Sequence, residues 1–132
     1  MRKRLDELGK KDIDVRSAGV RALNDLPPSD ETIEVMKEEG VDVSGFRTKN
    51  ITADMIKKSD LILAMEPAHE DEILALVPGA KSKAYLLKEY RSSHAFNSGD
   101  SGVNDPMGKP VEEYRIIRDE IKKEIERFAR GL

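Results

Sequence analysis

The sequence predicts an α/β fold with a parallel sheet, and two observations carry this prediction. Residues 61–65 form a continuous apolar run bounded by Asp60 and Glu66, as in a strand covered on both faces. Helix-like patterns alternate with such short strand-like segments along the chain. Right-handed crossovers would then place helices on both faces of the sheet. A length of 132 residues suits one domain with one core, spanning residues 1–132.

The start of the chain predicts a helix followed by a short strand. Leu5 and Leu8, among charged residues, mark the end of an amphipathic helix that Gly9 terminates. Residues 13–17 alternate apolar and polar side chains, which is the pattern of a strand.

Two capped helices follow. Ser29 or Asp30 can accept hydrogen bonds from the exposed N–H groups of a helix that Gly40 terminates. Thr52 caps a second helix that runs through Lys58.

The second half predicts two more helices, a strand and a loop. Pro67 stands at a plausible first position of a helix, and residues 84–87 form a short strand. Residues 91–104 form a long loop, and such loops are often functional. The last helix starts at Pro110. Its apolar stripe consists of Val111, Tyr114, Ile117, Ile121, Ile125 and Phe128.

Composition narrows the function classes. The chain has 23 basic and 26 acidic residues, interspersed, so no basic stripe suggests nucleic acid. Its longest apolar run is too short to cross a bilayer, and no signal peptide is recognisable, so a cytoplasmic location is expected. The chain contains no cysteine, which rules out disulfides, thiolate metal sites and cysteine nucleophiles within these 132 residues.

Five strings, in order, resemble the low-molecular-weight protein-tyrosine-phosphatase family, which includes bacterial arginine phosphatases and related arsenate reductases. They cover residues 15–20, 46–49, 59–66, 87–90 and 105–108. The resemblance extends over essentially the whole chain and implies a three-layer α/β/α flavodoxin-like fold with parallel strand order 2-1-3-4. In that family the first strand leads into a cysteine-containing loop that cradles phosphate at a helix N-terminus.

The resemblance implies a mechanism that this sequence cannot complete by itself. In the family the loop cysteine attacks phosphorus, a loop arginine clamps the phosphate oxygens, and an aspartate protonates the leaving group. The first strand, the cysteine and the loop arginine have no counterpart here, so the chain is expected to be an N-terminally truncated, inactive member. Arg16-Ser17 resembles the Arg-Ser at the end of the loop motif. It belongs instead to residues 15–20, which match the second strand of the family.

Asp105 is the expected general acid, by resemblance, and Pro106 would stiffen its loop. The alternative is an ordinary turn started by an Asp-Pro pair. Met107 is a further expected substrate-binding residue. Met107-Gly108 departs from the Tyr-Tyr pair of eukaryotic tyrosine phosphatases and is closer to the Phe-Gly of bacterial arginine phosphatases, which weakens a preference for phosphotyrosine. Ser17 and Asn24 are expected at the pocket mouth, although Ser17 is equally well an ordinary strand-end hydroxyl.

The histidines and tyrosines of the sequence do not indicate a second type of functional site. His69 follows Pro67 among carboxylates and is expected on a solvated helix face, whereas His94 could face the pocket. Two histidines are too few for a metal site, so neither a metal nor another cofactor is expected. The three tyrosines are expected in the core or at its rim: Tyr85, Tyr90 and Tyr114.

Three functions remain open at the level of sequence. The first is a truncated phosphatase whose ligand is a phosphorylated protein or a phosphate anion. The second is a non-catalytic pseudophosphatase that binds or scaffolds. The third, an unrelated metal- or cofactor-binding enzyme, is supported by no glycine-rich fingerprint or ligand cluster. Without a central first strand, homo-oligomerisation through exposed strand edges is expected.

Overall fold

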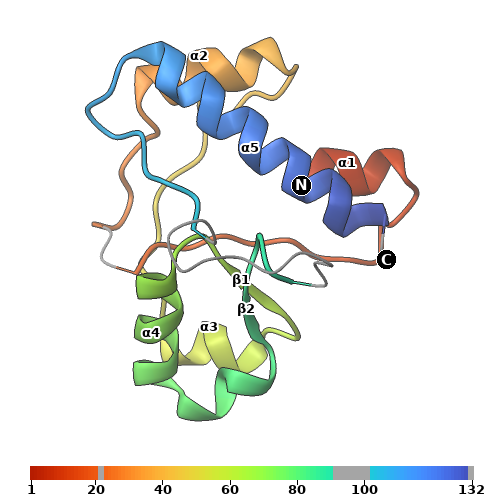
Figure 1. Ribbon diagram of the computed structural model, residues 1–132, viewed down its shortest axis with the longest axis vertical. Helices are drawn as coiled ribbons and strands as arrows, with labels where there is room; N and C mark the ends of the chain where they lie inside the picture. Colours follow the sequence, from red (N-terminus) through yellow and green to blue (C-terminus); the bar gives the residue numbers. More distant parts are fainter. Residues whose placement is uncertain (21–22, 91–101, 131–132) are drawn as a thin grey trace.

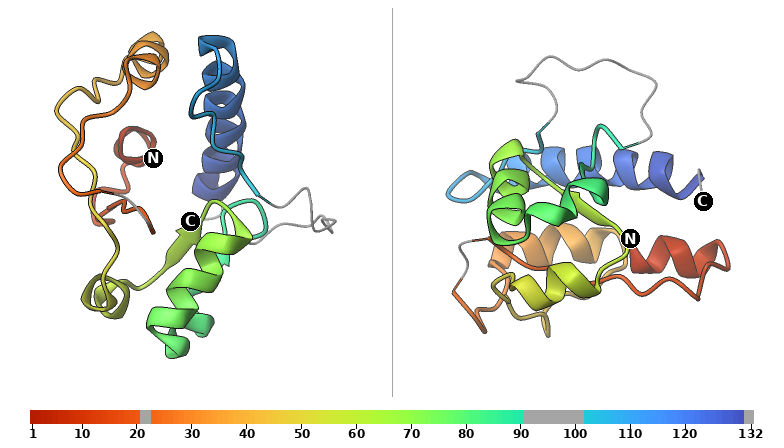
Figure 2. Two further views of the ribbon diagram at one scale, coloured as in Figure 1. Left: turned by 90° about the vertical axis from the view of Figure 1, so that its left-hand side faces the viewer. Right: turned by 90° about the horizontal axis from the view of Figure 1, so that it is seen from below.

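The helices lie on both sides of a small parallel sheet in the computed structural model, which describes residues 1–20, 23–90 and 102–130 (Figures 1 and 2). The helices on one side are α1 (Arg2–Glu7), α2 (Asp30–Glu38) and α5 (Val111–Arg130). Those on the other side are α3 (Ala53–Lys58) and α4 (Pro67–Leu76). The strands are β1 (Ile62–Ala64) and β2 (Ala84–Leu86), and the 3-10 helix η1 (Pro78–Ser82) precedes β2. This arrangement matches the layers that the sequence predicts.

The helix termini follow from local chemistry. The Ser29 hydroxyl accepts a hydrogen bond from the backbone N–H of Thr32 at 3.2 Å, and that of Thr52 accepts from Met55 at 3.2 Å. Both caps are predicted from the sequence because these side chains satisfy N–H groups that the first helical turn leaves unpaired. Pro67 occupies the first turn of α4, as predicted.

The parallel sheet leaves one edge of β1 open. The backbone N–H of Ile62 donates to the carbonyl of Lys83, and that of Leu87 donates to the carbonyl of Ala64, each at 2.9 Å. Ile62 and Ala64 therefore face β2. Because backbone groups alternate along a strand, the N–H and C=O of Leu63 point away from β2. In the described residues, β2 is the only strand that pairs with β1.

The predicted strand at residues 13–17 is wrong. The segment has no regular secondary structure, and the nearest pairing is an isolated parallel bridge between Gly19 and Asn50. Alternation of apolar and polar side chains makes a segment suitable for a sheet, but a strand also needs a neighbouring edge. Leu61 and Leu63 are only half-buried, so the predicted two-sided burial of residues 61–65 is incomplete.

The best-packed core lies between the sheet and the helices α3 and α4. Its buried members come from both helical and strand elements: Ile56, Ala64, Ile73, Ala80, Ala84 and Leu86. On the opposite side, Leu5 of α1, Val35 of α2 and Phe128 and Ala129 of α5 are buried, and the rest of the apolar stripe of α5 is half-buried. Apolar side chains are therefore buried on both sides of the sheet.

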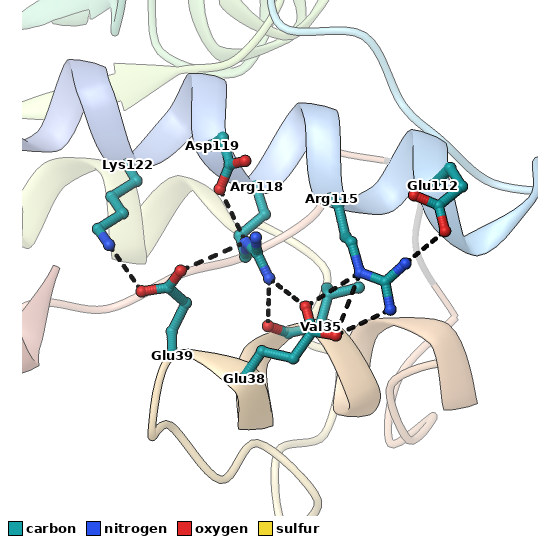
Figure 3. A network of polar contacts seen from close by, with 8 residues as sticks. All are labelled: Val35, Glu38, Glu39, Glu112, Arg115, Arg118, Asp119 and Lys122. Atoms are coloured by element: carbon teal, nitrogen blue, oxygen red, sulfur yellow. Dashed lines mark hydrogen bonds and ion pairs between the residues drawn. The ribbon is translucent and has the colours of Figure 1, made fainter.

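Charged side chains join α2 to α5 (Figure 3). The Arg115 guanidinium donates through Nε and Nη2 to the Glu38 carboxylate, with a shortest distance of 2.8 Å. Arg118 Nη1 donates to Glu38 Oε1 at 2.6 Å and to the backbone carbonyl of Val35 at 2.9 Å. Hydrogen bonds from Arg115 and then Arg118 lower the pKa of Glu38 to about 2.

Candidate active site

The segment that carries Asp105 is held at the carboxyl end of β1. The backbone N–H of Val103 donates to the carbonyl of Met65 at 2.7 Å, and the Val103 side chain is buried. Gly102 lies close to the start of α4, where an added Cβ would stand 3.5 Å from Cδ of Pro67. Because ligands of open α/β sheets bind outside the carboxyl ends of the strands, this is the expected place for a site.

Asp105 itself starts a tight turn. Its Oδ1 accepts a hydrogen bond from the backbone N–H of Met107 at 3.0 Å, and the N–H of Lys109 donates to the carbonyl of Pro106 at 2.9 Å. Gly108 has a φ of 79°, a conformation that glycine adopts without strain. The turn expected of an Asp-Pro pair is therefore present, with an exposed carboxylate that remains available for other chemistry.

A cavity of about 240 Å³ adjoins Asp105. It lies between the end of β1, the start of α4, the Asp105 segment and α5. The residues that line it are Met65, Glu66, His69, Val103, Asn104, Asp105, Pro106, Ile117 and Ile121. Its walls are mainly apolar, and Glu66 and Asp105 are the acidic residues among those that line it. Sequence reasoning did not connect the apolar stripe of α5 with this cavity, because only the tertiary fold brings the two together.

His69 belongs to this cavity, although the sequence favours a solvated helix face for it. Its Nε2 lies 3.8 Å from Oε2 of Glu66, and its side chain is 37% exposed. On the same helix, partial burial and the nearby carboxylates of Glu89 and Asp71 raise the pKa of Glu70. The acidic residues around His69 were visible in the sequence, but the direction of its ring was not.

The four candidate site residues do not converge on one pocket. Ser17 lines a different cavity of about 230 Å³, together with Ala18, Gly19, Phe46, Thr48 and Lys49. The Asn24 side chain accepts a hydrogen bond from the backbone N–H of Asn50 at 2.8 Å, which ties two loops together. Met107 is 78% exposed and does not line the cavity beside Asp105.

The aromatic residues pack against one another near the end of β2. The ring centroids of Tyr85 and Tyr90 are 4.9 Å apart, and those of Tyr90 and Phe128 are 5.7 Å apart. This confirms the prediction that Tyr85 and Tyr90 lie in or beside the core. His94 lies outside the described residues.

Within residues 1–20, 23–90 and 102–130, no group of three or more His, Asp or Glu side chains could hold a metal ion. The same residues contain no helix that is both long and apolar enough to cross a membrane.

Comparison with known proteins gives a consistent result over the whole chain. Residues 1–132 match the family model described as low molecular weight phosphotyrosine protein phosphatase. A protein-arginine-phosphatase of Geobacillus stearothermophilus is 34% identical over 120 residues, which are 91% of this chain and 77% of that protein. Arsenate reductase 1 of Staphylococcus saprophyticus is 31% identical over 122 residues, covering 92% of this chain and 79% of the relative.

Solved structures confirm the flavodoxin-like α/β fold. A low molecular weight protein tyrosine phosphatase from T. tengcongensis superimposes with a TM-score of 0.87 at 32% identity, covering 98% of this chain and 84% of its own. A second structure is an arginine phosphatase in which a serine replaces the active-site cysteine and is phosphorylated. It superimposes with a TM-score of 0.87 at 26% identity, covering 98% of this chain and 82% of its own.

Proposed function

Because the chain belongs to the low molecular weight phosphotyrosine protein phosphatase family, we propose that residues 1–132 form one phosphatase-like domain that does not hydrolyse phosphate esters by itself. The observation that carries this proposal is the absence of any cysteine from the 132 residues. In the related arginine phosphatase, the residue that becomes phosphorylated is a serine placed where the enzyme has its cysteine. A family reaction through a phosphorylated thiol therefore needs a group that these residues do not supply.

Asp105 is the part of the catalytic apparatus that we assign to this chain. Asp105 lines a cavity at the carboxyl end of β1, and its role there would be to protonate a leaving-group oxygen or nitrogen. The hydrogen bond from Met107 orients the carboxyl through Oδ1. The ligand of the cavity would be a phosphorylated side chain of a protein, with tyrosine and arginine as the two candidates suggested by the relatives' names.

A phosphatase assay tests the catalytic half of the proposal. We expect the purified chain to release no phosphate from p-nitrophenyl phosphate, phosphotyrosine peptides or phosphoarginine peptides above the buffer rate. The arginine phosphatase of Geobacillus stearothermophilus serves as the positive control under the same conditions. Robust turnover that disappears in Asp105→Asn would show that the chain carries a different nucleophile and would refute the proposal.

The second candidate function is phosphoprotein binding without hydrolysis. The apolar lining of the cavity beside Asp105 supports it, since such a cavity can hold a side chain without reacting with it. Titration calorimetry with phosphotyrosine, phosphoarginine and unphosphorylated peptides separates the two functions.

The DNA upstream of the Met1 codon offers a further distinction: the catalytic function expects an in-frame cysteine-containing loop, and the binding function expects none.

The proposal also covers location and assembly. A cytoplasmic location rests on the sequence composition alone. Self-association through an open strand edge rests on β1, whose Leu63 backbone groups face away from β2.

A further inference from the structure

We propose that the cavity beside Asp105 holds a positively charged side chain of a partner protein, namely an arginine that carries no phosphoryl group. This cavity has a volume of about 240 Å³ and lies at the carboxyl end of β1. The group recognised would be the guanidinium rather than a phosphate, which goes beyond the proposed function. Three features of the lining support this ligand: apolar surface, negative charge and unused hydrogen-bond acceptors.

The apolar part of the lining comes from separate elements of the fold. α5 contributes Ile117 and Ile121, which are half-buried, and the segment before α5 contributes Val103 and Pro106. Met65 follows β1 and is 37% exposed. Arginine buries its methylene stem along apolar surface of this kind and keeps its charged end near water. A partly exposed apolar lining therefore suits the stem of an arginine side chain.

The charge of the lining is negative. Glu66 and Asp105 belong to it, and the described residues that line the cavity include no lysine or arginine. These two acidic residues give the lining a formal charge of −2 while His69 is neutral. A phosphate dianion would meet charges of its own sign here, whereas a guanidinium would be attracted. The charge therefore favours a cation over a phosphoryl group.

Both acidic residues retain hydrogen-bond acceptors. Asp105 accepts one bond through Oδ1, from the Met107 N–H at 3.0 Å, and its Oδ2 accepts none among the described residues. The Glu66 side chain makes no cap bond to the first turn of α4. Its Oε2 lies 3.8 Å from Nε2 of His69, which is too long for a hydrogen bond. A ligand with several N–H donors could use these free acceptors.

Arginine meets these conditions better than lysine does. Its planar guanidinium carries five N–H donors in fixed directions and matches the geometry of carboxylates. The lysine ammonium is a compact charge that holds its water strongly, so moving it next to an apolar lining costs more free energy. We therefore expect arginine to bind more tightly than lysine.

Titration calorimetry of the full chain with short peptides tests the inference. The peptides share one neutral sequence and differ at a central position, which is arginine, lysine, citrulline, phosphoarginine or phosphotyrosine. Citrulline has nearly the shape of arginine but lacks its charge. We expect the arginine peptide to bind most tightly and the citrulline peptide to bind at least about tenfold more weakly. Added salt should weaken the arginine complex.

Two variants relate the binding to the cavity. Glu66→Gln keeps the size of the side chain and removes its charge. We expect its affinity for the arginine peptide to fall about tenfold and its affinity for the citrulline peptide to stay the same. Asp71→Asn is the control, because Asp71 is an exposed acidic residue of α4 outside the cavity lining, and no change is expected. Thermal unfolding checks that both variants fold like the original chain.

Equal affinity of the original chain for the arginine and citrulline peptides would overturn the inference, with or without the variants. So would equal losses in Glu66→Gln and Asp71→Asn, or a lysine peptide that binds better than the arginine peptide. Tighter binding of a phosphorylated peptide would overturn it and would support phosphoprotein binding instead. Absence of binding by all five peptides would overturn both, whatever the result of the phosphatase assay.

Discussion

At the scale of single residues, Asp105 has two separable roles. It lies beside the cavity, where it would act as an acid, and its Oδ1 stabilises the turn before α5. The acid role needs a carboxyl group that can release a proton. The turn role needs only an oxygen that can accept a hydrogen bond.

The turn role of Asp105 can be measured without any activity. Asp105→Ala removes the acceptor for the Met107 N–H, so we expect unfolding free energy to fall by about 1 kcal/mol. Asp105→Asn keeps a carbonyl oxygen in the same place and is expected to retain most of the stability. Urea unfolding of the three proteins makes the comparison. Equal stability of the alanine and original chains would show that the turn does not depend on this bond.

At the scale of elements, α2 is held to α5 by ion pairs that depend on pH. Glu38 accepts hydrogen bonds from Arg115 and Arg118, and these lower its pKa from 4.5 to about 2. A carboxylate whose pKa is depressed by folding stabilises the folded state above its unfolded pKa. That stabilisation is lost as the pH falls through the folded pKa. The relevant window for α2 therefore runs from pH 4.5 down to about 2.

We expect Glu38→Gln to lower stability at neutral pH, and the difference from the original chain to shrink as the pH falls through this window. The side chain of Glu38 is 38% exposed, so high salt should also reduce the difference. Glu34→Gln is the matched control, because Glu34 is an exposed glutamate on the same helix. Thermal unfolding at a series of pH values measures all three proteins. A difference that is constant with pH would contradict the proposed role of the Glu38 carboxylate.

At the scale of the whole molecule, apolar side chains are buried on both sides of the sheet, but those of α5 are mostly half-buried. The buried cluster joins α3, α4, η1 and the two strands, whereas most apolar side chains of α5 are half-buried. A substitution in the cluster should therefore cost more stability than one in the apolar stripe of α5. The half-buried apolar surface on the other side remains available for a ligand or a second chain.

Replacing one residue of the cluster and one of the α5 stripe tests this difference. Ile56 is fully buried between α3 and the sheet, so Ile56→Ala is expected to cost about 2–5 kcal/mol of unfolding free energy. Ile125 in the apolar stripe of α5 is half-buried, and Ile125→Ala is expected to cost less, about 1 kcal/mol. Chemical denaturation provides both values. Similar losses in the two variants would mean that the core is distributed evenly.

Local chemistry determined those parts of the molecule that the sequence predicts correctly. Ser29 and Thr52 cap their helices because a hydroxyl needs only the N–H groups of the next turn. The apolar runs that became β1 and β2 are likewise visible in the sequence, as is the family to which the chain belongs.

Tertiary structure alone decided whether residues 13–17 would pair and which candidate residues would share a pocket. A strand exists only beside another edge, and residues 13–17 have none among the residues that the structure describes, however suitable their alternation. Ser17 and Asp105 line different cavities because each position follows from contacts between elements far apart in the sequence. Patterns along a chain specify what a residue can do locally, and only the packing of distant segments brings its partners within reach.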